Sequence, residues 1–84
     1  MFLEVSDAEY IRDYLLKVTF NNGEIKLVDL KNSLQGPVFE PLKDKTFFRQ
    51  FTIHFNTVEW DNGADFAPEY LFQVGKPINT QFSE

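Results

Sequence analysis

Alternating apolar and polar residues predict a β-hairpin in the first third of the chain. Large apolar residues occupy every second position of residues 15–20, and apolar residues return in residues 25–30 after Asn22-Gly23. Asn-Gly is favoured in two-residue type I′ turns. The pairs predicted for such a loop are Phe20 with Ile25, Val18 with Leu27, and Leu16 with Asp29. Ile25 and Leu27 are therefore expected on the buried face.

A second hairpin is predicted for residues 52–60. A two-residue loop at Phe55-Asn56 pairs Ile53 with Val58 and Phe51 with Trp60, which places apolar residues opposite each other. The first strand is expected at residues 2–5. Residues 8–14 mix aromatic and charged residues without a clear period, and they predict an irregular approach to the first hairpin.

Short helices are predicted between and after the hairpins. Residues 31–35 form one helical turn that ends at Gly36. Pro41 disfavours helical backbone at the residue before it, so residues 38–42 are expected to be an extended connector. Asp44 can cap a helix over residues 45–50, on which Phe47 and Phe51 share a face and Phe48 either packs beside them or stays exposed. Pro68 is expected to open a helix over residues 69–72.

These elements predict an α+β fold in one compact domain: a small antiparallel sheet of two β-hairpins with short helices. The chain has 84 residues, 43% hydrophobic and 17% aromatic, which suits one globular domain. Residues 1–74 are expected to form that domain. Residues 75–84 contain early helix breakers and little pattern, so they are expected to be a flexible tail.

Charge and cysteine content narrow the classes of function. The formal net charge is −5, from 13 acids and 8 bases, so direct binding of nucleic acid is disfavoured. Lys43, Lys45 and Arg49 are the nearest approach to a basic cluster. There is no cysteine, no signal-peptide pattern and no apolar run long enough to span a membrane. A cytoplasmic setting is expected.

Residues 60–71 form the most specific stretch of the chain, with the single tryptophan, a glycine turn and a proline-led helix. Together with Val28-Asp29-Leu30, residues 36–39 and Pro41-Leu42, this block resembles the bacterial family of domains of unknown function DUF2442. The resemblance covers residues 5–72. It implies a small α+β domain with an antiparallel sheet, which in the family stands alone or is joined to a helix-turn-helix domain. For small stand-alone members it also implies toxin–antitoxin-like pairing. It implies no catalytic residue.

The acidic residues of this block suggest one candidate chemistry. Asp61, Asp65 and Glu69, with the amide oxygen of Asn62, could bind a hard cation such as Ca²⁺ or Mg²⁺. Their spacing departs from the EF-hand loop. Turn formation by Asp61 and Asn62, and the helix dipole for Asp65 and Glu69, explain the same residues without a ligand. A small-ligand or metal-binding domain is therefore the alternative hypothesis, and no cofactor is predicted.

No catalytic constellation is visible. His54 is the only histidine, and the sequence places no nucleophile in a suggestive position beside it. The chain is therefore expected not to be an enzyme.

Aromatic residues beyond the needs of the core favour an interaction surface. The leading hypothesis is a non-catalytic protein-interaction or regulatory module that binds another protein or forms a homodimer. The candidate contact residues are Phe48, Trp60, Phe66, Tyr70 and Phe72.

Overall fold

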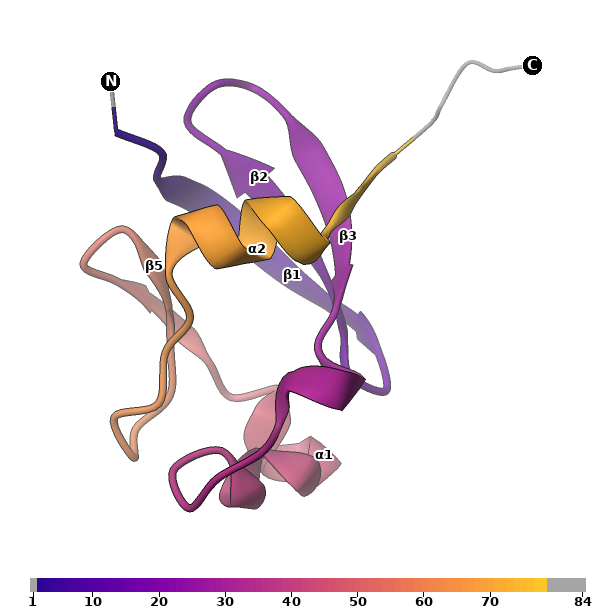
Figure 1. Cartoon of the computed structure of the whole chain (residues 1–84), viewed down its shortest axis with the longest axis vertical. Coiled ribbons are helices and arrows are strands. Elements are labelled where there is room, and N and C mark those ends of the chain that lie inside the picture. Colours follow the sequence, from indigo (N-terminus) through magenta and orange to yellow (C-terminus); the bar gives the residue numbers. More distant parts are fainter. Residues whose placement is uncertain (1, 79–84) are drawn as a thin grey trace.

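A computed structural model describes residues 2–78 and contains two antiparallel sheets and several short helices (Figure 1). In chain order the elements are β1 (Val5–Arg12), β2 (Leu15–Phe20), β3 (Ile25–Asp29), the 3₁₀ helices η1 (Lys31–Ser33) and η2 (Glu40–Lys43), α1 (Lys45–Phe48), β4 (Thr52–His54), β5 (Thr57–Glu59), α2 (Pro68–Val74) and β6 (Lys76–Pro77). The predicted α+β class is confirmed.

The two hairpins lie in different sheets, and the predicted single sheet of two hairpins is therefore wrong. The larger sheet has the order β1-β2-β3-β6, and β4 and β5 form a separate two-stranded sheet. Helix α2 lies across one face of the larger sheet, with β1 passing behind it, while α1 and the 3₁₀ helices gather at the lower end of the molecule (Figure 1). The backbone N–H of Val5 donates to the carbonyl of Asn56 at 2.8 Å, which joins β1 to the β4–β5 turn.

The predicted register of the first hairpin is wrong by one residue. Its loop has three residues: the N–H of Gly23 donates to the carbonyl of Phe20 at 3.0 Å, and the N–H of Phe20 donates to the carbonyl of Glu24 at 2.8 Å. Gly23 alone carries the left-handed conformation, with φ 89°. Asn22 does not have the positive φ that a type I′ turn requires, and its side chain accepts a hydrogen bond from the N–H of Glu24. Asn-Gly is compatible with this glycine-bulge loop as well, and here it takes that form.

This shift reverses the faces of β3. Val18 lies opposite Lys26 and Leu16 opposite Val28, so Lys26 and Val28 are buried while Ile25 is exposed on the other face of the sheet. A one-residue slip exchanges every side chain between the two faces of a strand. The ammonium of Lys26 donates to the carbonyl of Phe72 in the last turn of α2 at 2.8 Å and lies 3.5 Å from the Phe72 ring centre.

The glycine turn after β5 has the same form as the turn after β2. The N–H of Gly63 donates to the carbonyl of Trp60 and the N–H of Trp60 donates to the carbonyl of Ala64, both at 2.9 Å. Gly63 has φ 90°, and the Asn62 side chain accepts a bond from the N–H of Ala64 at 3.1 Å. Each turn thus has an aromatic residue, a polar residue and Asn-Gly, and each places its aromatic residue in the core.

The second hairpin forms with the predicted loop, but its ladder ends before the predicted pair of Phe51 with Trp60, whose rings still contact each other. Ile53 pairs with Val58, flanked by the pairs Thr52–Glu59 and His54–Thr57. Phe55 and Asn56 both have positive φ, at 50° and 69°, as a two-residue type I′ loop requires.

Three other segments differ from the prediction. Residues 5–12 are a strand, and register shifts between Val5 and Asp7 and between Tyr10 and Arg12 explain why its sequence does not alternate. Residues 40–43 form η2 instead of an extended connector, with Pro41 in its first turn. Part of the predicted tail, Lys76–Pro77, pairs with β3, while residues 79–84 lie outside the described residues.

The helix starts are confirmed. Asp44 caps α1 by accepting a hydrogen bond from the N–H of Thr46 at 2.9 Å, and Pro68 is the first residue of α2. Helix α1 ends two residues earlier than predicted and α2 two residues later.

Replacement of Lys26 by methionine tests its contribution to stability. Lys26→Met keeps the apolar stem but leaves the carbonyl of Phe72 without its charged donor, so we expect the free energy of unfolding to fall by about 1.5–3 kcal/mol. Urea denaturation measures this change. Lys17→Met, on the opposite face of the sheet, is the matched control and should change stability by no more than about 0.5 kcal/mol. Equal stability of the two variants would contradict a stabilising role for the buried ammonium.

Candidate functional site

Three of the five predicted contact residues are core residues. Phe48, Trp60 and Phe66 have at most 7% of their surface exposed, so the described chain does not present them to a partner. Phe48 was predicted as a contact residue because Phe47 and Phe51 were expected to form the buried face of the helix. Helix α1 has only four residues, and Phe48 instead packs beneath the tryptophan ring, with ring centres 5.6 Å apart.

Trp60 anchors this aromatic core. Its indole N–H donates to the carbonyl of Phe48 at 2.7 Å, and its ring contacts those of Phe51 and Phe66. A buried indole N–H needs such a partner. Trp60 therefore serves the fold.

The other two predicted contact residues lie on α2. Tyr70 is 38% exposed, but its ring stacks on Phe66 and its hydroxyl shares a 2.5 Å hydrogen bond with that of Ser33. Phe72 is half-buried and packs edge-on against Phe20. Both side chains hold α2 to the rest of the fold.

The acidic turn is organised by its own backbone. The side-chain oxygen of Asn62 accepts a hydrogen bond from the N–H of Ala64 within the turn. Its side-chain NH₂ donates to the carbonyl of Val38 at 2.9 Å, which connects the turn to the segment before η2. Asp65 forms an isolated bridge with Glu59 through the backbone. Within residues 2–78, no three His, Cys, Asp or Glu side chains gather closely enough to hold a metal ion.

His54 has a carboxylate partner. Its Nδ1 lies 2.5 Å from Oε1 of Glu59, across the β4–β5 hairpin, and the His54 side chain is 55% exposed. A base oriented by a carboxylate is one part of a catalytic constellation. Among the hydrogen bonds of the described chain, none joins His54 to a hydroxyl or an amine.

The hairpin tip is the most exposed apolar feature of the β4–β5 sheet. We use this name for Ile53, His54, Phe55 and Asn56. Phe55 is 84% exposed and Ile53 is 40% exposed, and the His54 ring lies 4.1 Å from that of Phe55. Phe55 was predicted in the loop but not as a contact residue. The available signal was an aromatic residue at a loop position where a type I′ turn favours glycine, asparagine or aspartate.

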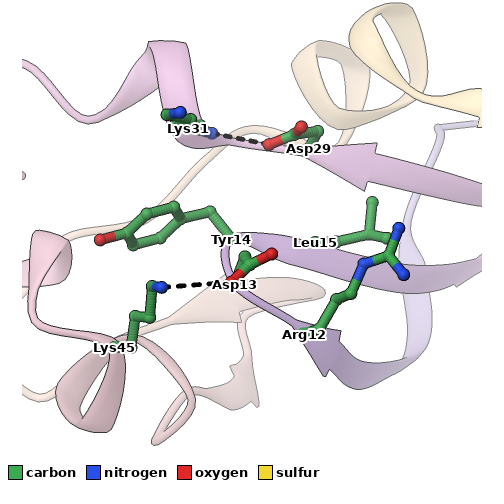
Figure 2. A pocket seen from close by; sticks show the side chains of 7 residues that line it. All are labelled: Arg12, Asp13, Tyr14, Leu15, Asp29, Lys31 and Lys45. Carbon is green, nitrogen blue, oxygen red and sulfur yellow. Dashed lines mark hydrogen bonds and ion pairs between the residues drawn. The ribbon is translucent and has the colours of Figure 1, made fainter.

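A second feature, the basic hollow, lies at the end of the larger sheet near α1 and has a volume of about 370 Å³. Figure 2 shows its lining: Arg12, Asp13, Tyr14, Leu15, Asp29, Lys31 and Lys45. Three bases and two acids thus come from the end of β1, the β1–β2 turn, the end of β3, η1 and α1. The ammonium of Lys45 lies 3.1 Å from Asp13, and Asp29 accepts a hydrogen bond from the backbone N–H of Lys31 at 3.0 Å.

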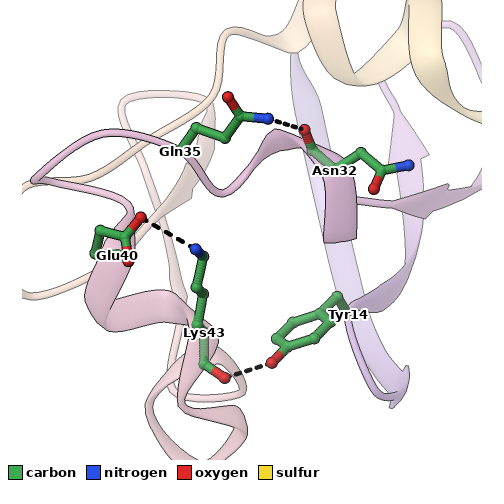
Figure 3. A network of polar contacts seen from close by, with 5 residues as sticks. All are labelled: Tyr14, Asn32, Gln35, Glu40 and Lys43. Atoms are coloured by element: carbon green, nitrogen blue, oxygen red, sulfur yellow. Dashed lines mark hydrogen bonds and ion pairs between the residues drawn. The ribbon is translucent and has the colours of Figure 1, made fainter.

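Hydrogen bonds around Tyr14 fix one wall of the basic hollow (Figure 3). The Tyr14 hydroxyl donates to the backbone carbonyl of Lys43, whose ammonium pairs with Glu40 at 3.1 Å. The Tyr14 carbonyl accepts from the N–H of Leu30 at 2.9 Å. Its ring also packs edge-on against Phe48, so the hollow rests on the aromatic core.

The acid beside Lys45 changes its titration. The hydrogen bond from Lys45 to Asp13, and then the charge of Asp13, raise the pKa of Lys45 above its ordinary value. The charged form is therefore favoured in the fold.

Comparison with protein families matches residues 5–76 to the family described as Protein of unknown function (DUF2442). The chain belongs to this family. The match spans β1, β2, β3, both glycine turns and α2 and ends at the first residue of β6, which confirms the resemblance seen in the sequence. No curated protein and no solved structure matches the chain. No helix within residues 2–78 is long and apolar enough to cross a membrane.

Removal of the Asp13 charge should lower the pKa of Lys45. In Asp13→Asn we expect the pKa to fall toward 10.5, the ordinary lysine value. In the wild type, the contribution of this pair to stability is present at neutral pH and is lost as the pH rises through the raised pKa. NMR titration of the lysine side-chain carbons measures the shift. Asp29→Asn, in the same hollow, is the control and should leave Lys45 unchanged; a similar drop in both variants would contradict the pairing.

Proposed function

We propose that this DUF2442 chain is a non-catalytic protein-interaction module whose principal contact residue is Phe55. The supporting observation is the combination of exposure and backbone conformation at that residue. Phe55 is 84% exposed and has φ 50°. For a residue with a side chain, the left-handed backbone conformation costs about 1–2 kcal/mol relative to the right-handed one.

Within residues 2–78, the one aromatic pair that includes Phe55 is with a residue that is itself largely exposed. Glycine, asparagine and aspartate are the residues that a type I′ loop favours, and Asn56 already fills the second position. The Phe55 ring packs on the His54 ring, which is itself 55% exposed at its side chain. Strained residues of this kind concentrate at binding sites. A rigid aromatic group on a hairpin is also a suitable anchor for a pocket on a partner.

Strand addition is a weaker route to association. The exposed residues of β1 include Asp7, Glu9 and Arg12, and register shifts interrupt the strand near both ends. Charges and bulges of this kind discourage pairing with another strand. The proposed contact is therefore made by side chains at the hairpin tip, with a protein partner that supplies an apolar pocket.

Site-specific photo-cross-linking tests the proposal. A benzoylphenylalanine at position 55 should cross-link to a defined protein, or to a second copy of the chain, in the native host. The same group at Gln73, exposed on α2, is the control position. The purified partner should then bind the wild type, and Phe55→Asn should weaken binding about 30-fold or more, as loss of a hot-spot aromatic does.

Ile25→Thr is the matched control, since Ile25 is exposed on the larger sheet away from the hairpin tip. It should leave the dissociation constant unchanged. Cross-linking no stronger at position 55 than at 73, or equal affinity of the Phe55→Asn variant, would refute the proposal.

Phe55→Asn should not destabilise the chain. Asparagine tolerates the left-handed conformation better than phenylalanine, so we expect the free energy of unfolding to stay constant or to rise by up to about 1 kcal/mol. Urea denaturation measures it. A loss of more than about 1 kcal/mol would mean that Phe55 serves the fold rather than a partner.

A further inference from the structure

We propose that the basic hollow binds the oxyanion group of a small ligand, a phosphate or a carboxylate, through Arg12 and Lys31. This site is separate from the hairpin tip and does not depend on the function proposed above.

The charge of the hollow differs from that of the chain around it. Its lining carries three bases and two acids, whereas the remaining sequence carries five bases and eleven acids. The charged residues of the hollow thus have a net charge of +1, and a concave surface with an excess of one sign concentrates the opposite charge even when the net charge of the protein is unfavourable. This hollow thus attracts an anion locally, in a chain that repels anions overall.

Two of its bases are free to meet a ligand. Lys45 is engaged by Asp13, and one oxygen of Asp29 is engaged by the backbone of the η1 turn. Within residues 2–78, neither Arg12 nor the ammonium of Lys31 forms an ion pair. An exposed guanidinium offers two parallel donors that match the oxygens of a carboxylate or a phosphate.

The strand register gives the hollow a defined floor. Arg12 lies opposite Leu15 on β2, and Leu15 lies opposite Asp29 on β3, so these three residues form a row across the sheet. Lys31 follows at the start of η1, and the Tyr14 ring lies between Lys31 and Lys45 (Figure 2). At about 370 Å³ the hollow is at the small end of ligand pockets. It therefore suits a ligand of a few heavy atoms with one or two anionic groups.

An NMR titration of the ¹⁵N-labelled full chain tests the site. Inorganic phosphate and succinate are added in separate arms, with sodium chloride adjusted to constant ionic strength. We expect saturable shifts confined to the residues that line the hollow, with a dissociation constant in the millimolar range. The arm with the tighter binding identifies the anionic group that the ligand carries.

A pair of double variants separates the site from general electrostatics. Arg12→Gln with Lys31→Gln should raise the dissociation constant at least tenfold. Lys17→Gln with Lys76→Gln changes the net charge equally at two residues that do not line the hollow, and it should leave binding unchanged. All four side chains lie at the surface or half-buried, so both variants are expected to keep the native spectrum.

Three results would overturn the proposal: no saturable shift with either anion, equal weakening in the two double variants, or shifts at the hollow with ethylenediamine in place of the anions. The last would assign the hollow to a cation held by Asp13 and Asp29.

Discussion

The hydrogen bond from the Trp60 indole to the carbonyl of Phe48 joins helix α1 to the glycine turn after the small sheet. One partner opens the glycine turn after the small sheet, and the other is the last residue of a four-residue helix that could not persist alone. The bond fixes the Phe48 ring, on which Tyr10 and Tyr14 of the larger sheet pack edge-on. Since Tyr14 forms a wall of the basic hollow, the position of that surface follows from a contact in the core.

The sequence was informative where local chemistry allowed one answer. Ile53 and Val58 could face each other in only one register, and Asp44 and Pro68 marked their helix starts. Asn22-Gly23 allowed two loops, and the choice between them decides whether Lys26 or Leu27 faces the core. Hydropathy predicts Leu27 in the core. The burial of Lys26 depends on its hydrogen bond to the Phe72 carbonyl of α2, which is far along the chain and cannot be seen from the local sequence. Strand β1 was missed since its bulges remove the alternation on which the prediction relied.

The candidate surfaces were harder to predict because they depend on tertiary structure. Arg12, Lys31 and Lys45 are distant in the sequence and line one hollow only because the end of β1, η1 and α1 converge. Three of the aromatic residues that composition made available are buried in the core, whereas Phe55 is exposed in its loop with the His54 ring beside it. In so small a domain, burial decides which aromatic residues remain for a partner.

The two glycine turns also fasten segments that have no strand partner. Asn21 bonds through its side chain to the carbonyl of Phe2 and the N–H of Glu4, and Asn62 bonds to the carbonyl of Val38. Each turn thus reverses the chain and also holds a neighbouring segment through its asparagine side chain, an arrangement called a clamp below. Opening one clamp would release the chain start or the segment before η2 while the strand ladders stay intact. The amides of these two segments can therefore exchange through local openings that do not require global unfolding.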